Sequence, residues 1–427
     1  MNGINISRLC RLAKEGAWVA GGQIAAVAGS LVLVKELTHY LAPAQYGQLA
    51  LGLTAAGLVN QVVMGGIIAG IGRFFAIAVE KKDLPGYLSA SKRLMGFASL
   101  AVLAIAVVLM IGLVLLGYLQ WLSLVLATLL FSIVGSYNSA LSGIQNAARQ
   151  RAIIAFHGGL DAWLKILLAV SCVLWLGASS TAVVVGYAIS SLLVTVSQLF
   201  FLRHAISPHA KSAPDSPQWV GQMWAYSWPF VTWGIFTWLH QASDRWALQA
   251  FASSADVGQY AVLFQLGYTP IALVTGMAMN FLGPILYQRA GDATDAARNE
   301  NVHRLSVQMA QLALVVTLMG VGLTLVIHAF LFQLLVAPQY HASSYLLPWV
   351  MLAGGLFATG QVLALKLMSD MKLLAMTRIK IATAVVGTLI NIVGAAHSGI
   401  RGVVAAQVAF SAVYLTWMMV ESKRLQK

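Results

Sequence analysis

Long apolar stretches alternate with short polar ones along the whole chain. Each apolar stretch is close to the roughly 20 residues that a helix needs to cross the hydrocarbon core of a bilayer. The pattern predicts twelve membrane-spanning helices, at residues 17–38, 48–72, 95–117, 121–144, 153–177, 181–202, 222–250, 259–286, 304–332, 344–368, 377–396 and 401–420. The longest outer loop, residues 333–343, has eleven residues. We therefore expect an all-α, polytopic membrane protein without an external domain.

Composition supports this fold class. The chain is 59% hydrophobic and 9% charged, whereas soluble domains carry about 25% charged residues. The net charge of +13 lies in short clusters between the apolar stretches, which is typical of membrane topology rather than of nucleic-acid binding. Cys10 and Cys172 are far apart in the sequence, and we expect no disulfide.

Basic residues also predict the orientation in the membrane. Of 26 Lys and Arg residues, 22 fall in alternate loops, close to the adjoining ends of the spans, or at the two ends of the chain, and Arg401 lies on the opposite side. By the positive-inside rule both termini are cytoplasmic. This leaves Lys35, Lys165 and Arg245 inside the predicted spans.

The chain also contains an internal repeat. A linker rich in Pro and Ser, residues 204–221, separates six spans in residues 1–203 from six in residues 222–427. The stretch "LAPAQYGQLAL" follows the first span and "SSADVGQYAVL" follows the seventh, so that Gly47 aligns with Gly258. Both halves start on the same side, so the repeats are parallel, and such repeats usually enclose a binding site at their interface.

Two longer stretches, "LTHYLAPAQYGQLALGL" and "DRWALQAFASSADVGQYAV", resemble signatures of the polysaccharide transporter (Wzx-like O-antigen flippase) family. That family belongs to the multidrug/oligosaccharidyl-lipid/polysaccharide exporter superfamily. The resemblance implies two six-helix bundles that form a V-shaped central cavity and alternate access. It also implies flipping of an undecaprenyl-diphosphate-linked oligosaccharide, such as an O-antigen repeat unit, to the outer leaflet of the bacterial inner membrane. A polysaccharide polymerase is the implied protein partner.

Polar residues inside the spans mark the candidate site. A charge at the bilayer centre costs about 2.5–3.5 kcal/mol, so it normally faces a cavity or a partner. The fifth span carries His157, Asp161 and Lys165 at four-residue spacing, which places them on one helical face. The seventh span carries Gln241, Arg245 and Gln249 at the same spacing, and the inner half of the fourth carries Asn138, Ser142, Gln145 and Arg149.

These faces suit a cargo with a diphosphate, because Arg and Lys are the usual partners of phosphate. We interpret the polar residues of the spans in three groups: substrate-binding Arg245, Lys165, Lys35, Trp238 and Gln241; coupling or gate residues Asp161, Asp244 and Glu36; and cavity-lining His157, Asn138, Gln145, Arg149 and Gln249.

The charged pairs have a second interpretation. Asp161 and Lys165 are also placed to neutralise each other. Adjacent residues such as Asp244 and Arg245 diverge by about 100° around a helix, so Arg245 is expected to face the cavity while Asp244 turns toward Lys35 and closes an outer gate.

Competing functions are a cation-coupled exporter of drugs or small molecules and a membrane enzyme. A drug-cation site should be acidic, whereas three cations here accompany three acids inside the spans. A polysaccharide polymerase or ligase needs an external catalytic loop, which the spans leave no room for. The sequence has no phosphate-binding loop, no HExxH and no Cys/His metal spacing, and we expect no cofactor and no nucleic-acid partner.

Topology gives the first prediction. Reporter fusions after Lys211 and after Ser343 should report the cytosol and the outer compartment, respectively, because basic residues are concentrated on one side of the predicted membrane. The reverse pattern in both fusions would contradict the orientation, and the same compartment for both would contradict the count of spans.

Overall fold

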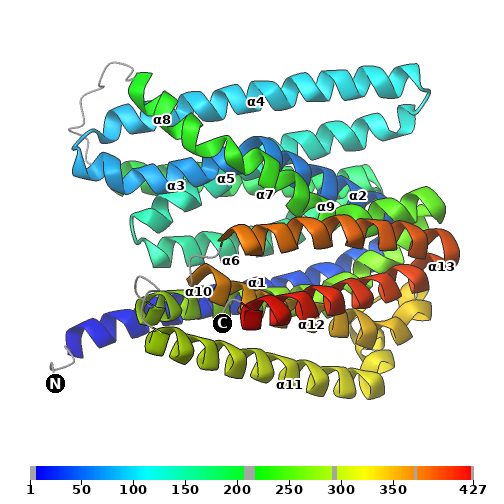
Figure 1. The fold of residues 1–427 in the computed structure, drawn as a ribbon. Coiled ribbons are helices and arrows are strands. Elements are labelled where there is room, and N and C mark those ends of the chain that lie inside the picture. Colours follow the sequence, from blue (N-terminus) through cyan, green and yellow to red (C-terminus); the bar gives the residue numbers. More distant parts are fainter. Residues whose placement is uncertain (1–5, 206–216, 291–295, 370–372, 425–427) are drawn as a thin grey trace. The chain divides into compact units, whose positions relative to one another are not determined.

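The computed structural model describes residues 6–205, 217–290, 296–369 and 373–424, and these are almost entirely helical (Figure 1). In chain order the elements are α1 (Ile6–Tyr40), α2 (Pro43–Val59), the π-helix η1 (Asn60–Met64), α3 (Gly65–Glu80), α4 (Leu84–Leu115), the 3-10 helix η2 (Leu119–Trp121), α5 (Leu122–Ala147), α6 (Arg151–Leu176), α7 (Ser180–Ala205), α8 (Pro217–Ser227), α9 (Pro229–Phe251), α10 (Ser254–Ala290), α11 (Ala296–Leu335), the 3-10 helix η3 (Pro338–Leu346), α12 (Leu347–Ser369) and α13 (Leu373–Arg424). The prediction of an all-α polytopic protein is confirmed.

The predicted spans coincide with helical stretches, except that the seventh is divided between α8 and α9 at Trp228. Spans 11 and 12 share α13, where Ser398 and Gly399 leave helical geometry and Gly399 has φ +54°. Glycine adopts this left-handed conformation without a steric cost, and Figure 1 shows the orange and red halves of α13 running back beside each other. Among the described residues, nine helical stretches are long and apolar enough to cross a membrane. Neither α1 nor α9, which carry internal charges, is among the nine.

Contacts between residues divide the chain into two compact units. Unit 1 comprises Met1–Leu41 and Leu51–Trp238, and unit 2 comprises Ala42–Ala50 and Leu239–Lys427. The predicted limits at residues 203 and 222 describe repeats of six spans and stay a prediction. Of the predicted linker, residues 206–216 lie outside the described residues.

Small residues bring helices of unit 1 close together. On α1, a Cβ added at Gly22 would lie 3.0 Å from the Cβ of Ala155, and one at Gly29 would lie 3.2 Å from that of Ala162. Both pairs are spaced by seven residues, two helical turns, so α1 and α6 stay in register over this length. Backbones that approach closely gain the van der Waals contact that drives helix association in lipid.

The short helix α8 is attached to the turn between α3 and α4. The indole N–H of Trp219 donates to Asp83 Oδ2 at 2.6 Å, and the Lys81 ammonium lies 5.3 Å from the centre of the same ring. The carboxylate of Asp83 also accepts the Gly86 backbone N–H as the N-cap of α4. One buried indole therefore connects three helices of unit 1.

In unit 2, the two glycines that the repeat aligns pack directly against each other's helix. A Cβ on Gly47 would overlap the Ser254 carbonyl oxygen, and a Cβ on Gly258 would overlap that of Pro43. Pro43 and Ser254 each precede the glycine of their own helix by four residues, so the contact is reciprocal. Beside it, the rings of Tyr46 and Tyr340 meet edge to face at 5.9 Å.

This crossing gives the second prediction. Gly47→Ala should lower the thermal stability of the purified protein, because the added methyl forces two backbones apart and overpacking costs about 1–3 kcal/mol. Gly57→Ala is the matched control on the same helix, since a Cβ there meets nothing within 4 Å. The control should be neutral or stabilising by about 0.4–1 kcal/mol. Equal melting temperatures for the two variants would contradict the close crossing.

Candidate transport site

Unit 1 holds an ion pair on α6, the helix of predicted span 5. Lys165 Nζ lies 2.5 Å from Asp161 Oδ2, and their side chains are 25% and 19% exposed. The hydroxyl of Ser190 on α7 donates to Asp161 Oδ1 at 3.3 Å, and the Lys165 ammonium lies 5.6 Å from the ring centre of Phe131 on α5. The pair is thus partly accessible and supported from two neighbouring helices.

His157, one turn before Asp161, is buried between α6 and α7. Its Nδ1 is 2.8 Å from the Ile153 carbonyl oxygen, and its Nε2 is 3.0 Å from Ser197 Oγ. A carbonyl only accepts hydrogen bonds, so Nδ1 carries the proton and Nε2 of the neutral ring accepts from the Ser197 hydroxyl. His157 therefore joins two helices, and its predicted place on a cavity wall stays a prediction.

Amide side chains form a second polar contact, between α5 and α7. Gln198 donates from Nε2 to Ser142 Oγ at 2.9 Å. Gln145, one turn further along α5, is fully buried, and neither of its side-chain polar atoms has a partner among the described residues. An unpaired buried amide costs free energy, which is consistent with a polar or hydrated interior at this level of unit 1.

The π-helix η1 lies next to this polar face. The Ser136 hydroxyl on α5 donates to Asn60 Oδ1 at 2.5 Å, and the Ser132 hydroxyl donates to the Ala56 carbonyl at 3.3 Å. A Cβ on Gly234 of α9 would meet the backbone of Gln61, so α9 packs tightly against the irregular turn. Single π turns inside α-helices are frequent at functional sites.

Unit 2 buries the carboxylate of Asp244 completely, with 1% of its side chain exposed. Oδ2 accepts the Tyr260 hydroxyl at 2.7 Å and the Gln407 amide at 3.2 Å. Oδ1 accepts the backbone N–H of Arg245 at 2.7 Å. Donors from α9, α10 and α13 thus satisfy the carboxylate, and breaking such a buried set is strongly destabilising.

Arg245 has a different environment from its neighbour. Its Nη1 is 3.5 Å from Asp244 Oδ1 and donates to the Gln241 carbonyl at 2.9 Å. The guanidinium lies 4.4 Å from the ring centre of Phe264 and 5.9 Å from that of Tyr260. The side chain is 12% exposed. A guanidinium has five N–H donors, and one of them, on Nη1, is used for the Gln241 carbonyl.

A group of aromatic rings in unit 2 begins at Phe264, the ring next to Arg245. The sequence alone did not predict that these rings come together. Phe264 stacks on Tyr268 at 4.4 Å, and His240 lies 4.5 Å from Phe410 and 4.8 Å from Phe357. Phe357 in turn stacks on Tyr414 at 4.9 Å. The members, which we call the aromatic cluster, come from four helices: His240, Phe264, Tyr268, Phe357, Phe410 and Tyr414.

Lys366 is also buried, which the sequence did not predict. It is 2% exposed, and its ammonium donates to the Ser422 carbonyl at 2.9 Å. The sequence pattern grouped it with loop cations because Lys372 and Arg378 follow closely. Its burial couples the ends of α12 and α13.

The remaining predicted residues have diverse positions. Trp238 donates its indole N–H to the Thr54 carbonyl at 2.7 Å, which ties α9 to α2 within unit 1. Gln249 accepts from the Ser254 hydroxyl at 2.9 Å. Lys35 and Arg149 are exposed, whereas Glu36 and Asn138 are partly buried.

The approach of Asp244 to Lys35 joins residues of the two units and stays a prediction. Within the described chain, no group of three or more His, Cys, Asp and Glu side chains is placed to hold a metal ion. Chemically, the arrangement offers two paired cations: an ammonium beside Asp161 in unit 1 and a guanidinium beside Asp244 in unit 2.

Residues 12–289 match a family model described as polysaccharide biosynthesis protein. A search of curated sequences found no significantly similar protein.

Solved structures with the same fold are transporters. A structure of the lipid II flippase MurJ in an inward closed conformation superposes with a TM-score of 0.72 at 10% identity, covering 96% of this chain and 87% of that one. An inward-facing multidrug resistance MATE family transporter of the MOP superfamily gives 0.63 at 15% identity, with 94% and 95% covered. A MOP superfamily transporter from Pyrococcus furiosus gives 0.59 at 12% identity, with 96% of both chains covered. At these identities the likeness shows the fold.

The ion pair on α6 gives the third prediction. If Asp161 and Lys165 serve only to neutralise each other, removing both charges should be milder than removing one, since a single loss leaves an uncompensated charge. If Lys165 also binds the transported anion, the double variant Asp161→Ala/Lys165→Ala should fold but stay inactive. Thermal stability and transport are measured for both single variants and the double variant. Normal transport by the folded double variant would exclude the binding role.

Proposed function

The chain belongs to the polysaccharide biosynthesis protein family, and on this premise we propose that it is a lipid-linked oligosaccharide flippase. The cargo would be an oligosaccharide joined by a diphosphate to undecaprenol, such as an O-antigen repeat unit. It would move by alternating access from the cytoplasmic to the outer leaflet of the bacterial inner membrane. Transport of this kind involves no covalent step, so we assign no enzymatic activity.

The observation that carries the proposal is the environment of Arg245. A diphosphate cannot enter hydrocarbon unpaired, so a flippase must offer it fixed cations and hydrogen-bond donors. Because Tyr260 and Gln407 already satisfy Asp244, the guanidinium is not needed as that carboxylate's sole partner. Arg binds phosphate through two parallel N–H donors, and the ring of Phe264 beneath it limits the orientations of the planar group.

Lys165 supports the same chemistry in unit 1. Its ammonium pairs with Asp161 but is a quarter exposed, so the cation is still accessible to an anion. Under this proposal Asp161 becomes uncompensated whenever Lys165 binds cargo, which makes it the candidate for proton or cation coupling. Lys35 and Glu36 remain candidates for a gate.

The alternative is a cation-coupled exporter of drugs or small molecules. The drug-exporter function remains a candidate because similar solved structures include multidrug resistance transporters of the MATE family. In that case Asp161 and Asp244 would be the working residues, and the aromatic cluster would contact an apolar cation. The two functions differ in what Arg245 does: it binds the cargo in the first and balances Asp244 in the second.

Arg245 substitutions give the fourth prediction. Arg245→Ala should lower polysaccharide export in cells about 10- to 100-fold, because a charge-assisted hydrogen bond contributes about 1.5–3 kcal/mol and 1.4 kcal/mol corresponds to a factor of ten. Arg245→Lys should retain part of the export, since the cation remains but the planar fork is lost. Surface polysaccharide is quantified and normalised to the amount of protein in the membrane.

The matched control for this experiment is Arg73→Ala, which removes an exposed cation from α3 of unit 1 and should leave export unchanged. Normal export by Arg245→Ala would contradict the proposed role. A loss of export explained by degradation of the protein would make Arg245 a structural residue, and resistance to drugs conferred by the wild type would favour the alternative.

A further inference from the structure

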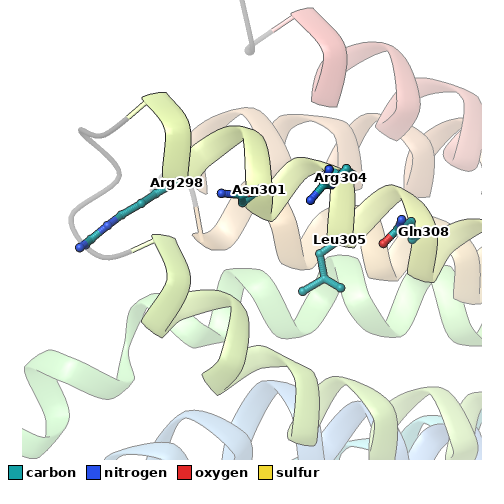
Figure 2. Close-up of a pocket in the computed structure, with 5 residues that line it drawn as sticks. All are labelled: Arg298, Asn301, Arg304, Leu305 and Gln308. Atoms are coloured by element: carbon teal, nitrogen blue, oxygen red, sulfur yellow. The ribbon is translucent and has the colours of Figure 1, made fainter. Parts of the chain in front are cut away.

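The polar end of α11 holds a pocket that is separate from the candidate transport site. Its volume is about 320 Å³, and its lining is Arg298, Asn301, Arg304, Leu305 and Gln308. Figure 2 shows these five side chains along the first turns of α11. Of the described residues that line it, two carry a positive charge and none a negative one.

The polar members of this pocket share one face of the helix. Positions 298, 301, 304 and 308 lie within about 120° of one another around an α-helix, and all four side chains are exposed. The guanidinium of Arg304 and the amides of Asn301 and Gln308 supply several N–H donors along this face, and Arg298 adds a second positive charge at its end. This is the chemistry that recognises a phosphate.

The same face continues as an apolar stripe. Leu305, at the edge of the pocket, is followed at seven-residue intervals by Leu312, Met319 and Val326, which are 65%, 70% and 82% exposed. Beyond the pocket, exposed apolar positions continue from Leu312 to Leu334, a rise of about 33 Å, close to the roughly 30 Å thickness of the hydrocarbon core. This length predicts that the stripe faces lipid and that the pocket lies at headgroup level.

We propose that this pocket binds the phosphate headgroup of a membrane lipid whose chains lie along Leu312 and Met319. A free phosphate would use the pocket but gain nothing from the stripe, whereas a lipid uses both. Basic pockets at the cytoplasmic ends of membrane helices bind anionic headgroups in this way, and the positive-inside rule assigns this end of α11 to the cytoplasmic side. The site does not depend on the proposed transport function.

Lipid binding to the full-length protein tests the proposal. The purified protein is titrated with phosphatidylglycerol, with phosphatidylcholine as the neutral-headgroup reference, and bound lipids are counted by native mass spectrometry. We expect one phosphatidylglycerol molecule to be retained preferentially and Arg304→Gln to weaken its binding about tenfold. Arg304→Lys should keep part of the affinity, because the charge remains.

Arg378→Gln is the matched control, since it removes an exposed cation near the start of α13. It should leave the affinity for phosphatidylglycerol unchanged, and melting temperatures of all variants confirm that they are folded. Equal weakening by Arg304→Gln and Arg378→Gln would overturn the proposal, because binding would then follow net charge.

Two further probes identify the source of the phosphate. Inorganic phosphate should bind much more weakly than the lipid, and equal affinity would overturn the assignment to a lipid. If undecaprenyl diphosphate depends on Arg304 and binds more tightly than phosphatidylglycerol, the site holds and its ligand is the polyprenyl lipid. Because binding is measured without transport, loss of the site and failure of the flippase proposal give different results.

Discussion

The structure of unit 2 depends on one constraint, that a carboxylate removed from water must have its charge compensated. Asp244 pairs with the guanidinium of Arg245 at 3.5 Å, and its oxygens accept hydrogen bonds from Tyr260 on α10, Gln407 on α13 and the backbone of its own helix α9. The acid therefore links three helices. It also shapes what Arg245 can do: the guanidinium balances the charge, and since three other donors satisfy the carboxylate oxygens, Arg245 is not the carboxylate's only partner.

Local spacing in the sequence was sufficient to predict the spans and one ion pair. Asp161 and Lys165, one turn apart on a helix, meet at 2.5 Å because i and i+4 residues share a face. Contacts between distant segments could not be predicted in this way. Gln407 is 163 residues from Asp244, and the aromatic cluster draws on four helices whose packing no single stretch encodes. The contact of Trp238 could not be predicted from local spacing either, because its indole N–H donates to the Thr54 carbonyl on α2, 184 residues away.

Two arginines show how environment separates roles within one chain. Arg245 is largely buried against the rings of Phe264 and Tyr260, where loss of hydration strengthens its electrostatic attraction to an anion. Arg304 is exposed at the polar end of α11, next to an apolar stripe that faces lipid. The first environment suits a cargo phosphate that enters and leaves, and the second suits a resident lipid of the bilayer.

Under the proposed function, this chain by itself moves a lipid-linked anionic oligosaccharide across a bilayer. The most direct measurement places the purified protein in liposomes that contain an undecaprenyl-diphosphate oligosaccharide and follows the sugar that an enzyme outside the vesicles can cleave. We expect the enzyme to cleave nearly all of the sugar when the protein is present, whereas in protein-free vesicles the half in the inner leaflet should stay protected. Protection that persists with the folded protein present, together with uptake of an organic cation by the same vesicles, would contradict the account and establish the drug-exporter alternative.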